Sequence, residues 1–444
     1  MTNSDTIFAL SSGLGRAAIA ILRISGGSAG AVLESLVGAL PSAREFALRT
    51  LRNSQTGEVL DRSVVVWLPA PLSFTGEDCA ELHLHGSPSV VAAVMAYLNH
   101  QPGVRPAEPG EFTRRAFVKG KLDLIEVEGL ADLLDARTAS QREQAMRQMT
   151  GEASSTFESW RGQLLSIRAD IEAAVDFADE ADIAVTAIQG VDGQIEALLQ
   201  SITAALARSK TAEVVRDGVR VVLSGHPNTG KSSLLNHLAR REVAIVSDVP
   251  GTTRDSIEVS LDLNGIPIIL TDTAGLRFAA SDAVEAEGMR RSRHHMAQAD
   301  VLVWVWSDDV FGSENPDPVR CPDIVVRNKC DLRRPLVNHA ENIAYHSISA
   351  RTGQGIEGFV DALQAMLGNR FGDVDSALIV SARQQAVVIE SIRLLNDCLA
   401  VSSAGLELKA EILRLAAEEI GRLTGRVDVE EWLGVIFSRF CIGK

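Results

Sequence analysis

The sequence has few cysteines, few aromatic side chains and no membrane-length apolar run. The five cysteines are Cys79, Cys321, Cys330, Cys398 and Cys441. Their spacing fits neither a metal site nor a disulfide framework, which is typical of a protein in a reducing compartment. The apolar run at residues 90–98 is nine residues long, whereas a membrane helix needs about 20. The chain does not open with a basic segment and a long apolar run. We therefore expect a soluble, cytoplasmic protein with no membrane partner.

The chain also lacks an excess of positive charge. Its formal net charge is −15, which argues against a broad nucleic-acid-binding face, so any RNA contact must be local or shared with a partner. Hydrophobic residues make up 46% and charged residues 23% of the sequence, as in globular proteins. A chain of 444 residues is too long for one ordinary core and predicts roughly two to four domains.

A phosphate-binding loop is the clearest motif in the chain. Residues 225–232 read GHPNTGKS, after an apolar run at residues 219–223 and before a helical pattern. In this strand–loop–helix context the backbone N–H groups and the helix dipole favour a phosphate anion. Lys231 is expected to reach the β- and γ-phosphates, and the Ser232 hydroxyl to bind Mg²⁺.

A second motif selects the base of the nucleotide. An apolar run at residues 324–327 ends in Asn328, Lys329, Cys330 and Asp331. The Asp331 carboxylate can accept paired hydrogen bonds from guanine N1–H and the exocyclic amine, which adenine does not present. We expect Asn328 to brace the loop and the Lys329 stem to cover the ring. Residues 349–351 should supply a backbone N–H to guanine O6, so GTP is favoured over ATP.

The residues that would activate water depart from the usual pattern. Asp272 ends a strand whose hairpin partner precedes the Asn264-Gly265 turn, and it begins the sequence DTAG. Ras-like enzymes place a water-orienting Gln directly after such a turn, but Leu276 stands here. An apolar residue cannot orient water. Three acidic residues are candidate replacements: Asp282, Glu285 and Glu287.

The domain pattern is an insertion. Residues 1–118 mix short strands and helices, whereas residues 119–215 and 372–444 are helical. The nucleotide motifs lie between the two helical blocks, at residues 216–371. We predict an α/β P-loop GTPase domain inserted in an all-α helical domain, with an N-terminal α+β domain.

His83 and His85 share one strand face and could bind metal, but without a third ligand ordinary hydrogen-bonded histidines are favoured.

Over essentially its whole length the chain resembles the tRNA modification GTPase family MnmE, also called TrmE. In the GTPase region the resemblance lies in residues 225–232, in GTTRD at 251–255 and in DTAGLR at 272–277. Six further segments carry it in the outer regions: LRISG at 22–26, TGED at 75–78, ELHLHG at 81–86, EPGEFTRRAF at 108–117, GKLDL at 120–124 and CIGK at 441–444. These six are specific to the family.

The resemblance implies a homodimer whose N-terminal domains bind 5-formyl- or methylene-tetrahydrofolate and whose GTPase domains approach each other during turnover. With an FAD-dependent partner, MnmG, in a heterotetramer, the family adds an aminomethyl-type group to C5 of the wobble uridine of certain tRNAs. Four residues match family positions that contact the folate: Arg23, Glu81, Lys121 and Lys444. Cys441 matches a family thiol near the one-carbon site, where a catalytic role and a merely small residue are equally open.

The resemblance further implies that K⁺ replaces an arginine finger, held by Asn228 and by backbone carbonyls of Ser247, Val249 and Thr252. Mg²⁺ would take Ser232 and Thr253, and Glu285 would orient the hydrolytic water through a bridge. The expected GTP-binding residues are Asn228, Thr229, Gly230, Lys231, Ser232, Ser233, Ser247, Asp248, Val249, Pro250, Gly251, Thr252, Thr253, Asp272, Thr273, Ala274, Gly275, Asn328, Lys329, Asp331, Ser349, Ala350 and Arg351.

An alternative interpretation is a regulatory or ribosome-assembly switch GTPase with no role in nucleotide modification. The GTPase motifs alone do not separate the two hypotheses. The N-terminal segments and residues 441–444 favour the modification enzyme.

Overall fold

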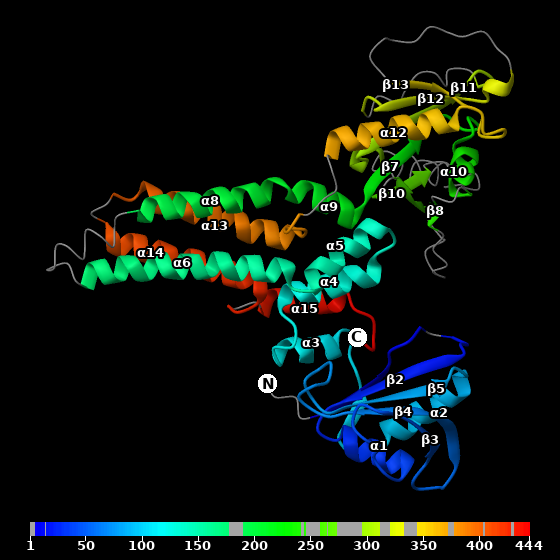
Figure 1. The fold of residues 1–444 in the computed structure, drawn as a ribbon. Helices are drawn as coiled ribbons and strands as arrows, with labels where there is room; N and C mark the ends of the chain where they lie inside the picture. The colour runs from blue at the N-terminus through cyan, green and yellow to red at the C-terminus, as the bar shows by residue number, and fades with distance from the viewer. Residues whose placement is uncertain are drawn as a thin grey trace, which may run out of the picture. The chain divides into compact units, whose positions relative to one another are not determined.

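The computed structural model describes residues 5–13, 15–176, 190–240, 244–245, 258–263, 265–272, 295–310, 320–332, 344–371, 377–402, 405–427 and 430–444. The chain divides into two compact units (Figure 1). The first unit comprises residues 1–131, 148–165 and 414–444, and the second comprises residues 132–147 and 166–413. Each unit therefore combines segments that are distant in the sequence.

A six-stranded sheet organises the first unit, in the order β3-β4-β5-β2-β1-β6. Its strands are β1 (Thr6–Leu10), β2 (Ile19–Ser25), β3 (Phe46–Arg52), β4 (Val59–Leu68), β5 (Cys79–His85) and β6 (Val104–Pro106). The pairings are antiparallel except that of β1 with β6. Residues 6–10, 18–24, 63–69 and 79–85 have sequence patterns typical of strands and predict β1, β2, β4 and β5, whereas no pattern predicts β3 or β6.

Two helices cover one face of this sheet. Helices α1 (Ala29–Val37) and α2 (Pro88–Asn99) pack on alternate strand residues such as Leu22 and Leu82, which are fully buried. The intervening residues, including Arg23 and Glu81, which are register partners, therefore point to the opposite face. That face is where the expected folate residues of β2 and β5 lie.

The C-terminal tail returns to the N-terminal domain. Helix α15 (Glu430–Ser438) packs with α3 (Glu111–Val118) and α4 (Leu124–Asp135) through apolar residues that include Phe437 and Leu124. Beyond α15, Ile442 forms a β-bridge with Pro109. The tail thus pairs with a segment more than 300 residues earlier in the chain.

Glu111, at the start of α3, is a buried carboxylate with many donors. It accepts hydrogen bonds from Arg105 Nη2 (2.6 Å), Arg115 Nη2 (3.0 Å) and the Glu108 backbone N–H (2.9 Å). Burial alone would raise the pKa of Glu111, but these donors outweigh it and lower the pKa from 4.5 to about 2. The ionised form is therefore favoured in the folded state.

We expect Glu111 to contribute acid-sensitive stability. Because its folded pKa lies below 4.5, the contribution is present above about pH 4.5 and is lost as the pH falls toward 2. It amounts to roughly 3 kcal/mol at neutral pH. Urea unfolding between pH 7 and pH 2.5 should show Glu111→Gln destabilised at pH 7 and less dependent on pH below 4.5. The exposed Glu108→Gln is the matched control, and equal acid slopes for both variants would contradict the prediction.

The helical blocks of the sequence form helices whose residues belong to both compact units. The helices are α5 (Ala139–Met149), α6 (Glu152–Asp176), α8 (Val191–Ala207), α9 (Ser209–Asp217), α13 (Ala382–Ala400) and α14 (Leu406–Thr424). Helix α8 lies beside α13 (Figure 1), so the two sequence blocks join in one helical assembly, as the insertion pattern predicts. The buried Lys409 of α14 donates to Asp192 at the start of α8 (2.6 Å).

A seven-stranded sheet forms the centre of the inserted domain, in the order β13-β12-β11-β7-β10-β9-β8. The strands are β7 (Val219–Ser224), β8 (Ala244–Ile245), β9 (Glu258–Leu263), β10 (Ile266–Asp272), β11 (Val301–Ser307), β12 (Ile324–Asn328) and β13 (Ala344–Ser347). They are parallel except for β9, which pairs antiparallel with β8 and β10. A 3-10 turn, η1 (Cys330–Leu332), follows β12.

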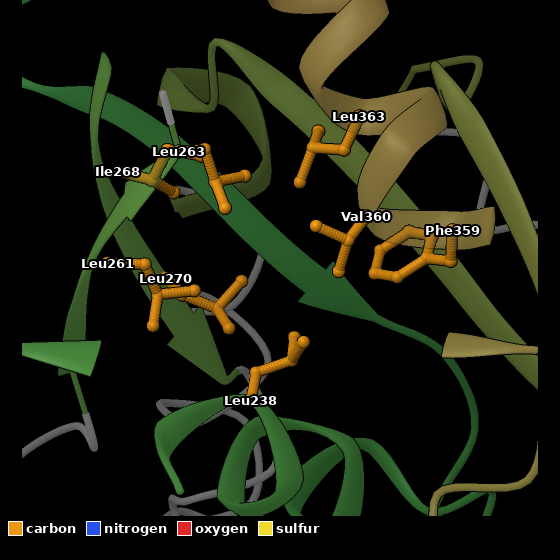
Figure 2. A pocket seen from close by; sticks show the side chains of 8 residues that line it. All are labelled: Leu238, Leu261, Leu263, Ile268, Leu270, Phe359, Val360 and Leu363. Atoms are coloured by element: carbon orange, nitrogen blue, oxygen red, sulfur yellow. The ribbon is translucent and has the colours of Figure 1, made fainter. Parts of the chain in front are cut away.

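Helices α10 (Lys231–Ala239) and α12 (Ile356–Phe371) pack on the sheet through the largest apolar cluster of this domain. A small cavity lies between them and the β9–β10 hairpin (Figure 2). Its lining is wholly aliphatic or aromatic: Leu238, Leu261, Leu263, Ile268, Leu270, Phe359, Val360 and Leu363. A space of about 20 Å³ without polar partners is a dry packing gap, not a site for a polar ligand. Of the described helices, none is long and apolar enough to cross a membrane.

Candidate functional site

The phosphate loop connects β7 to α10. Gly225 and Gly230 have φ angles of 143° and 94°, and each faces a close neighbour. A Cβ on Gly225 would lie 2.0 Å from the Val305 carbonyl oxygen, and one on Gly230 would lie 2.2 Å from Asn328 Nδ2. Glycine is therefore required at both positions for the loop to keep this shape.

Lys231 and Ser232 follow the loop at the start of α10. The Lys231 ammonium is buried and donates to the carbonyl oxygens of Gly225 and His226, both at 2.8 Å. Burial lowers its pKa, and the nearby Asp272 carboxylate opposes that shift. Anionic phosphates at the loop would favour the charged form further.

Asp272 ends β10 beside the loop. The Ser232 hydroxyl donates to Asp272 Oδ2 at 2.5 Å, and Asp272 is 1% exposed. A hydroxyl and a carboxylate this close offer the hard oxygen ligands that Mg²⁺ takes together with phosphate oxygens. The structure brings these two predicted residues together.

Asn328 joins the two loops that are expected to bind the nucleotide. Its Nδ2 donates to the Thr229 carbonyl oxygen, and its Oδ1 accepts from the Ala350 backbone N–H, both at 2.9 Å. Asn328 is 2% exposed and Thr229 is fully buried. One side chain therefore links the phosphate loop to residues 349–351.

The base-reading carboxylate has partners of its own. The Ser349 hydroxyl and then the Arg351 guanidinium hold the pKa of Asp331 below its usual range, and Arg351 Nη2 donates to Asp331 Oδ2 at 2.7 Å. Lys329 Nζ donates to the Asn228 carbonyl oxygen and to Asp309 Oδ2, both at 2.7 Å. Asp331 is thus an ionised acceptor, and Lys329 spans the site from the base loop to the phosphate loop.

The phosphate loop also contacts an indole. The His226 ring meets the Trp304 ring edge to face, with centroids 6.0 Å apart. Trp304 belongs to β11, which pairs with β7, and is 4% exposed. His226 is exposed, so the loop rests on a buried aromatic ring of the neighbouring strand.

Several expected site residues lie outside the described residues: Ser247, Asp248, Val249, Pro250, Gly251, Thr252, Thr253, Thr273, Ala274, Gly275 and Glu285. The remaining nucleotide-site residues come together around the carboxyl ends of β7, β10 and β12. Ser233, the third residue of α10, has an exposed side chain. Asn228 has a φ of 66° and is exposed.

A second cluster lies on the open sheet face of the first unit. Arg23 Nε donates to Glu81 Oε1 at 3.1 Å, and its guanidinium lies over the Phe74 and Phe112 rings at 5.1 and 5.8 Å. The His83 Nε2 atom is buried without a hydrogen bond, 3.5 Å from Glu81 Oε2. A cation that lies over two aromatic rings, a carboxylate and an unsatisfied polar atom are therefore neighbours on this face.

The C-terminal tail brings Lys444 into this cluster. Burial lowers the pKa of Lys444, the Arg23 charge lowers it further, and Glu81 opposes both. The preceding Gly443 has a φ of 101°, its carbonyl accepts from Ser11 Oγ at 2.9 Å, and a Cβ there would lie 2.2 Å from the Leu10 carbonyl oxygen. The structure thus gathers Arg23, Glu81 and Lys444, three of the four residues expected to contact folate.

The other N-terminal candidates are placed differently. Lys121 is exposed, and its stem packs over Gly76, where a Cβ would lie 3.3 Å from Lys121 Cγ. The Cys441 side chain is exposed, and its carbonyl accepts from Lys444 N at 3.3 Å. His85 Nδ1 is 2.7 Å from Asp61 Oδ1, as expected for a hydrogen-bonded histidine. Among the described residues, no three His, Cys, Asp or Glu side chains gather to hold a metal ion.

Some functional contacts were missed at the sequence level. Arg327 Nε donates to Asp308 at 3.0 Å and Lys329 pairs with Asp309. Both aspartates directly follow β11, a neighbour of β12, and acidic residues at that strand end were the available signal. The Arg351–Asp331 contact had no such signal, because exposed arginines have many alternative partners.

A parallel sheet that carries a phosphate loop after its central strand and an Asn-Lys-Cys-Asp loop two strands away is the architecture of a P-loop GTPase. The domain built around β7 belongs to that class. Residues 124–441 match the family model described as the MnmE helical domain, and residues 6–121 match that of the GTP-binding protein TrmE N-terminus.

Full-length relatives specify the class further. The tRNA modification GTPase MnmE of Methylobacterium sp. (strain 4-46) is 48% identical over 444 residues, covering 99% of this chain and 100% of the relative. That of Bradyrhizobium sp. (strain ORS 278) is 47% identical over 445 residues, covering 100% and 99%. Among solved structures, the G domain of the T. maritima FeoB iron transporter is 23% identical, and the match covers 33% of this chain and 98% of that one. The TM-score of this match is 0.25. The chain belongs to the MnmE family of tRNA modification GTPases.

Proposed function

We propose that this GTPase acts with the FAD-dependent partner MnmG to add an aminomethyl- or carboxymethylaminomethyl-type group to C5 of the wobble uridine of certain tRNAs. The one-carbon unit would come from 5-formyl- or methylene-tetrahydrofolate bound to the first unit. The observation that carries the proposal is the cluster of Arg23, Glu81 and Lys444, to which the C-terminal tail contributes a partly buried ammonium group.

The chemistry of this cluster suits a folate. Glu81 offers a carboxylate to the N–H groups of a pterin, and the buried His83 Nε2 offers a further polar contact. Phe74 and Phe112 provide ring faces beside Arg23. Arg23 and Lys444, together with the exposed Lys121, would supply cations for the glutamate tail. Bound folate would supply the transferable one-carbon unit, and these side chains would bind and orient it.

The same sheet face supports a homodimer. Ile19, Phe46 and Leu48 lie on the face opposite α1 and α2 and are 57%, 73% and 54% exposed. Exposed apolar side chains gathered on one sheet face are typical of protein interfaces. A second copy of this chain would cover them. The exposed face therefore supports the homodimer that the family resemblance implies. The domain organisation that we propose for each copy is residues 1–118, 119–215, 216–371 and 372–444.

In the GTPase domain, Ser232 and Asp272 would hold Mg²⁺, with Thr253 as a further ligand, and Asp331 would read guanine. Asn228, with carbonyls of residues 247, 249 and 252, would hold K⁺, whose charge stabilises the negative charge that develops during phosphoryl transfer. Glu285 would orient the attacking water. Because Leu276 follows Gly275, these groups would replace the usual glutamine and arginine.

Replacing K⁺ by Na⁺ is expected to lower the GTP turnover rate at least tenfold, because the smaller ion fits the same oxygen shell poorly. Phosphate release should be measured at constant ionic strength with a fixed Mg²⁺ concentration. GDP affinity in the two salts is the control, since the cation acts on the transition state. Equal turnover in both salts would show that no K⁺ site operates.

The modification itself can be tested in cells. A deletion strain should lack the C5 group on wobble uridines when its tRNA nucleosides are analysed by mass spectrometry. The wild-type chain should restore the group, and Glu81→Ala should not. Unchanged nucleosides in the deletion strain would favour the alternative, a regulatory or ribosome-assembly switch GTPase.

A further inference from the structure

The β9–β10 hairpin connects the nucleotide site to a distant turn. β10 ends at Asp272, 2.5 Å from the Ser232 hydroxyl, and β9 begins at Glu258, with two residues between it and the end of the GTTRD segment. The opposite end of the hairpin is the turn at Gly265. A displacement of that turn therefore moves both strands that lead to the nucleotide.

The turn end of the hairpin projects beyond the central sheet. Pairing of β10 with β7 begins only at Ile268, opposite Val219, so Ile266 and Pro267 extend past β7. On its other side, among the residues that the structure describes, β9 pairs with the two-residue strand β8 alone. The turn end of the hairpin therefore has fewer strand partners than the Asp272 end.

Residues at the start of α5 form hydrogen bonds with this projecting end of the hairpin. Ser140 Oγ donates to the Gly265 carbonyl oxygen, and Arg137 Nη1 donates to Ser260 Oγ on β9 at 2.8 Å. Both residues lie in the segment 132–147, which belongs to the same compact unit as the GTPase domain. The contact therefore lies within one unit although it joins residues more than 120 positions apart.

The start of α5 is itself held in place by hydrogen bonds. Gln141 Oε1 accepts from the backbone N–H groups of Arg137 (2.8 Å) and Thr138 (3.2 Å), while Thr138 Oγ1 accepts from Gln141 N, forming a capping box at α5. Gln141 Nε2 also donates to the Arg216 carbonyl oxygen just before β7, at 3.0 Å. The start of α5 is thus tied to the chain segment that enters the phosphate-loop strand.

Hydrogen bonds supplement the packing of α9 on β10 at this end of the hairpin. A cavity of about 230 Å³ separates the start of α5 and the end of α9 from the strands, and it is bordered by Arg137, Gln141, Arg216, Ser260 and Pro267. This volume accommodates several waters. The contacts of Arg137 and Ser140 cross that space and contribute to the position of the hairpin.

We propose that Arg137 and Ser140 are positioning residues for GTP hydrolysis, which hold the β9–β10 hairpin so that Asp272 stands correctly against the phosphate loop. This inference rests on the GTPase activity of the family and not on the tRNA chemistry proposed above. An error of about 1 Å in such positioning lowers a rate by up to about a hundredfold, and losing one hydrogen bond of the pair has a smaller effect.

The test uses the full-length chain. Arg137→Ala/Ser140→Ala should lower kcat for GTP about fivefold to tenfold in K⁺ and Mg²⁺, with GDP affinity changed less than about twofold. Ser140→Thr keeps the hydroxyl and should retain most of the rate. Ser155→Ala, which removes a hydroxyl that bonds only within its own helix, is the matched control and should have no effect. A double variant with a rate within twofold of the wild type would overturn the proposal.

A double-mutant cycle separates positioning from general loosening. Ser260→Ala removes the acceptor of the Arg137 bond from the other side, so Arg137→Ala and Ser260→Ala should each lower kcat and should not add when combined. Independent, additive losses, or a fall in GDP affinity that matches the fall in kcat, would show that the contact only stabilises the fold.

Discussion

Asp331→Asn is expected to lower GTP affinity by roughly a hundredfold to a thousandfold. In the proposed site the carboxylate would accept two hydrogen bonds from guanine, each worth about 1.5–3 kcal/mol when one partner is charged. About 1.4 kcal/mol corresponds to tenfold in affinity. The asparagine amide would place a donor against guanine donors. Ser349 and Arg351 keep the pKa of Asp331 low, so the wild-type group is a pure acceptor at neutral pH.

Xanthosine triphosphate provides the diagnostic comparison. Xanthine carries a C2 carbonyl in place of the amine, so it can accept a hydrogen bond from the introduced asparagine amide, and the variant should bind it at least tenfold more tightly than the wild type does. Asp309→Asn neutralises a neighbouring carboxylate that pairs with Lys329, and it should leave the GTP-to-xanthosine-triphosphate ratio unchanged. Competition with a fluorescent GDP analogue measures the affinities of the wild type, Asp331→Asn and Asp309→Asn for both nucleotides. A continued preference of Asp331→Asn for GTP would contradict base reading by Asp331.

Gly443→Ala is expected to lower 5-formyltetrahydrofolate affinity at least tenfold. Gly443 has a φ of 101°, and its Cβ would lie 2.2 Å from the Leu10 carbonyl oxygen and 3.0 Å from Ser11 Cα. Backbone atoms on both sides cannot yield easily, so the tail must leave this position and carry Lys444 away from Arg23 and Glu81. Isothermal titration calorimetry with the full-length protein measures the loss.

Two controls confine that effect to the tail. Gly434→Ala adds a methyl group on α15, where no atom lies within 4 Å, and it should leave folate affinity unchanged. GDP affinity should be unaffected in both variants, because the nucleotide loop belongs to the other compact unit. Equal folate affinities in Gly443→Ala and Gly434→Ala would refute the role of the tail.

The nucleotide site was largely predictable because its parts are local. The phosphate loop, Asp272 and residues 328–331 are short contiguous motifs that follow strands, and parallel strands bring their carboxyl ends to one edge. Asn328 was expected to brace the loop, and it bridges Thr229 and Ala350. The hairpin turn at Gly265, with a φ of 84°, follows from its Asn-Gly sequence.

The remainder depends on contacts between distant residues. β3 alternates exposed Phe46 and Leu48 with half-buried positions and carries arginines, so as an edge strand it shows no clear apolar face. The hydrogen bond from Ser140 to the Gly265 carbonyl oxygen could not be predicted, because a single hydrogen bond between residues far apart in the chain has no sequence pattern. The approach of Lys444 to Arg23 was implied only by the family resemblance.

The edge-to-face contact of His226 with Trp304 gives the chain an intrinsic optical reporter. Indole emission responds to the charge and polarity of whatever touches the ring, and here a side chain of the phosphate loop touches it. Occupation of the loop by a nucleotide can therefore be followed by tryptophan fluorescence in the unlabelled protein. Trp306, on the same strand beside Arg327 at 5.9 Å, would contribute a background signal, as would Trp67, Trp160 and Trp432. Replacing these four tryptophans by Phe would isolate the response of Trp304.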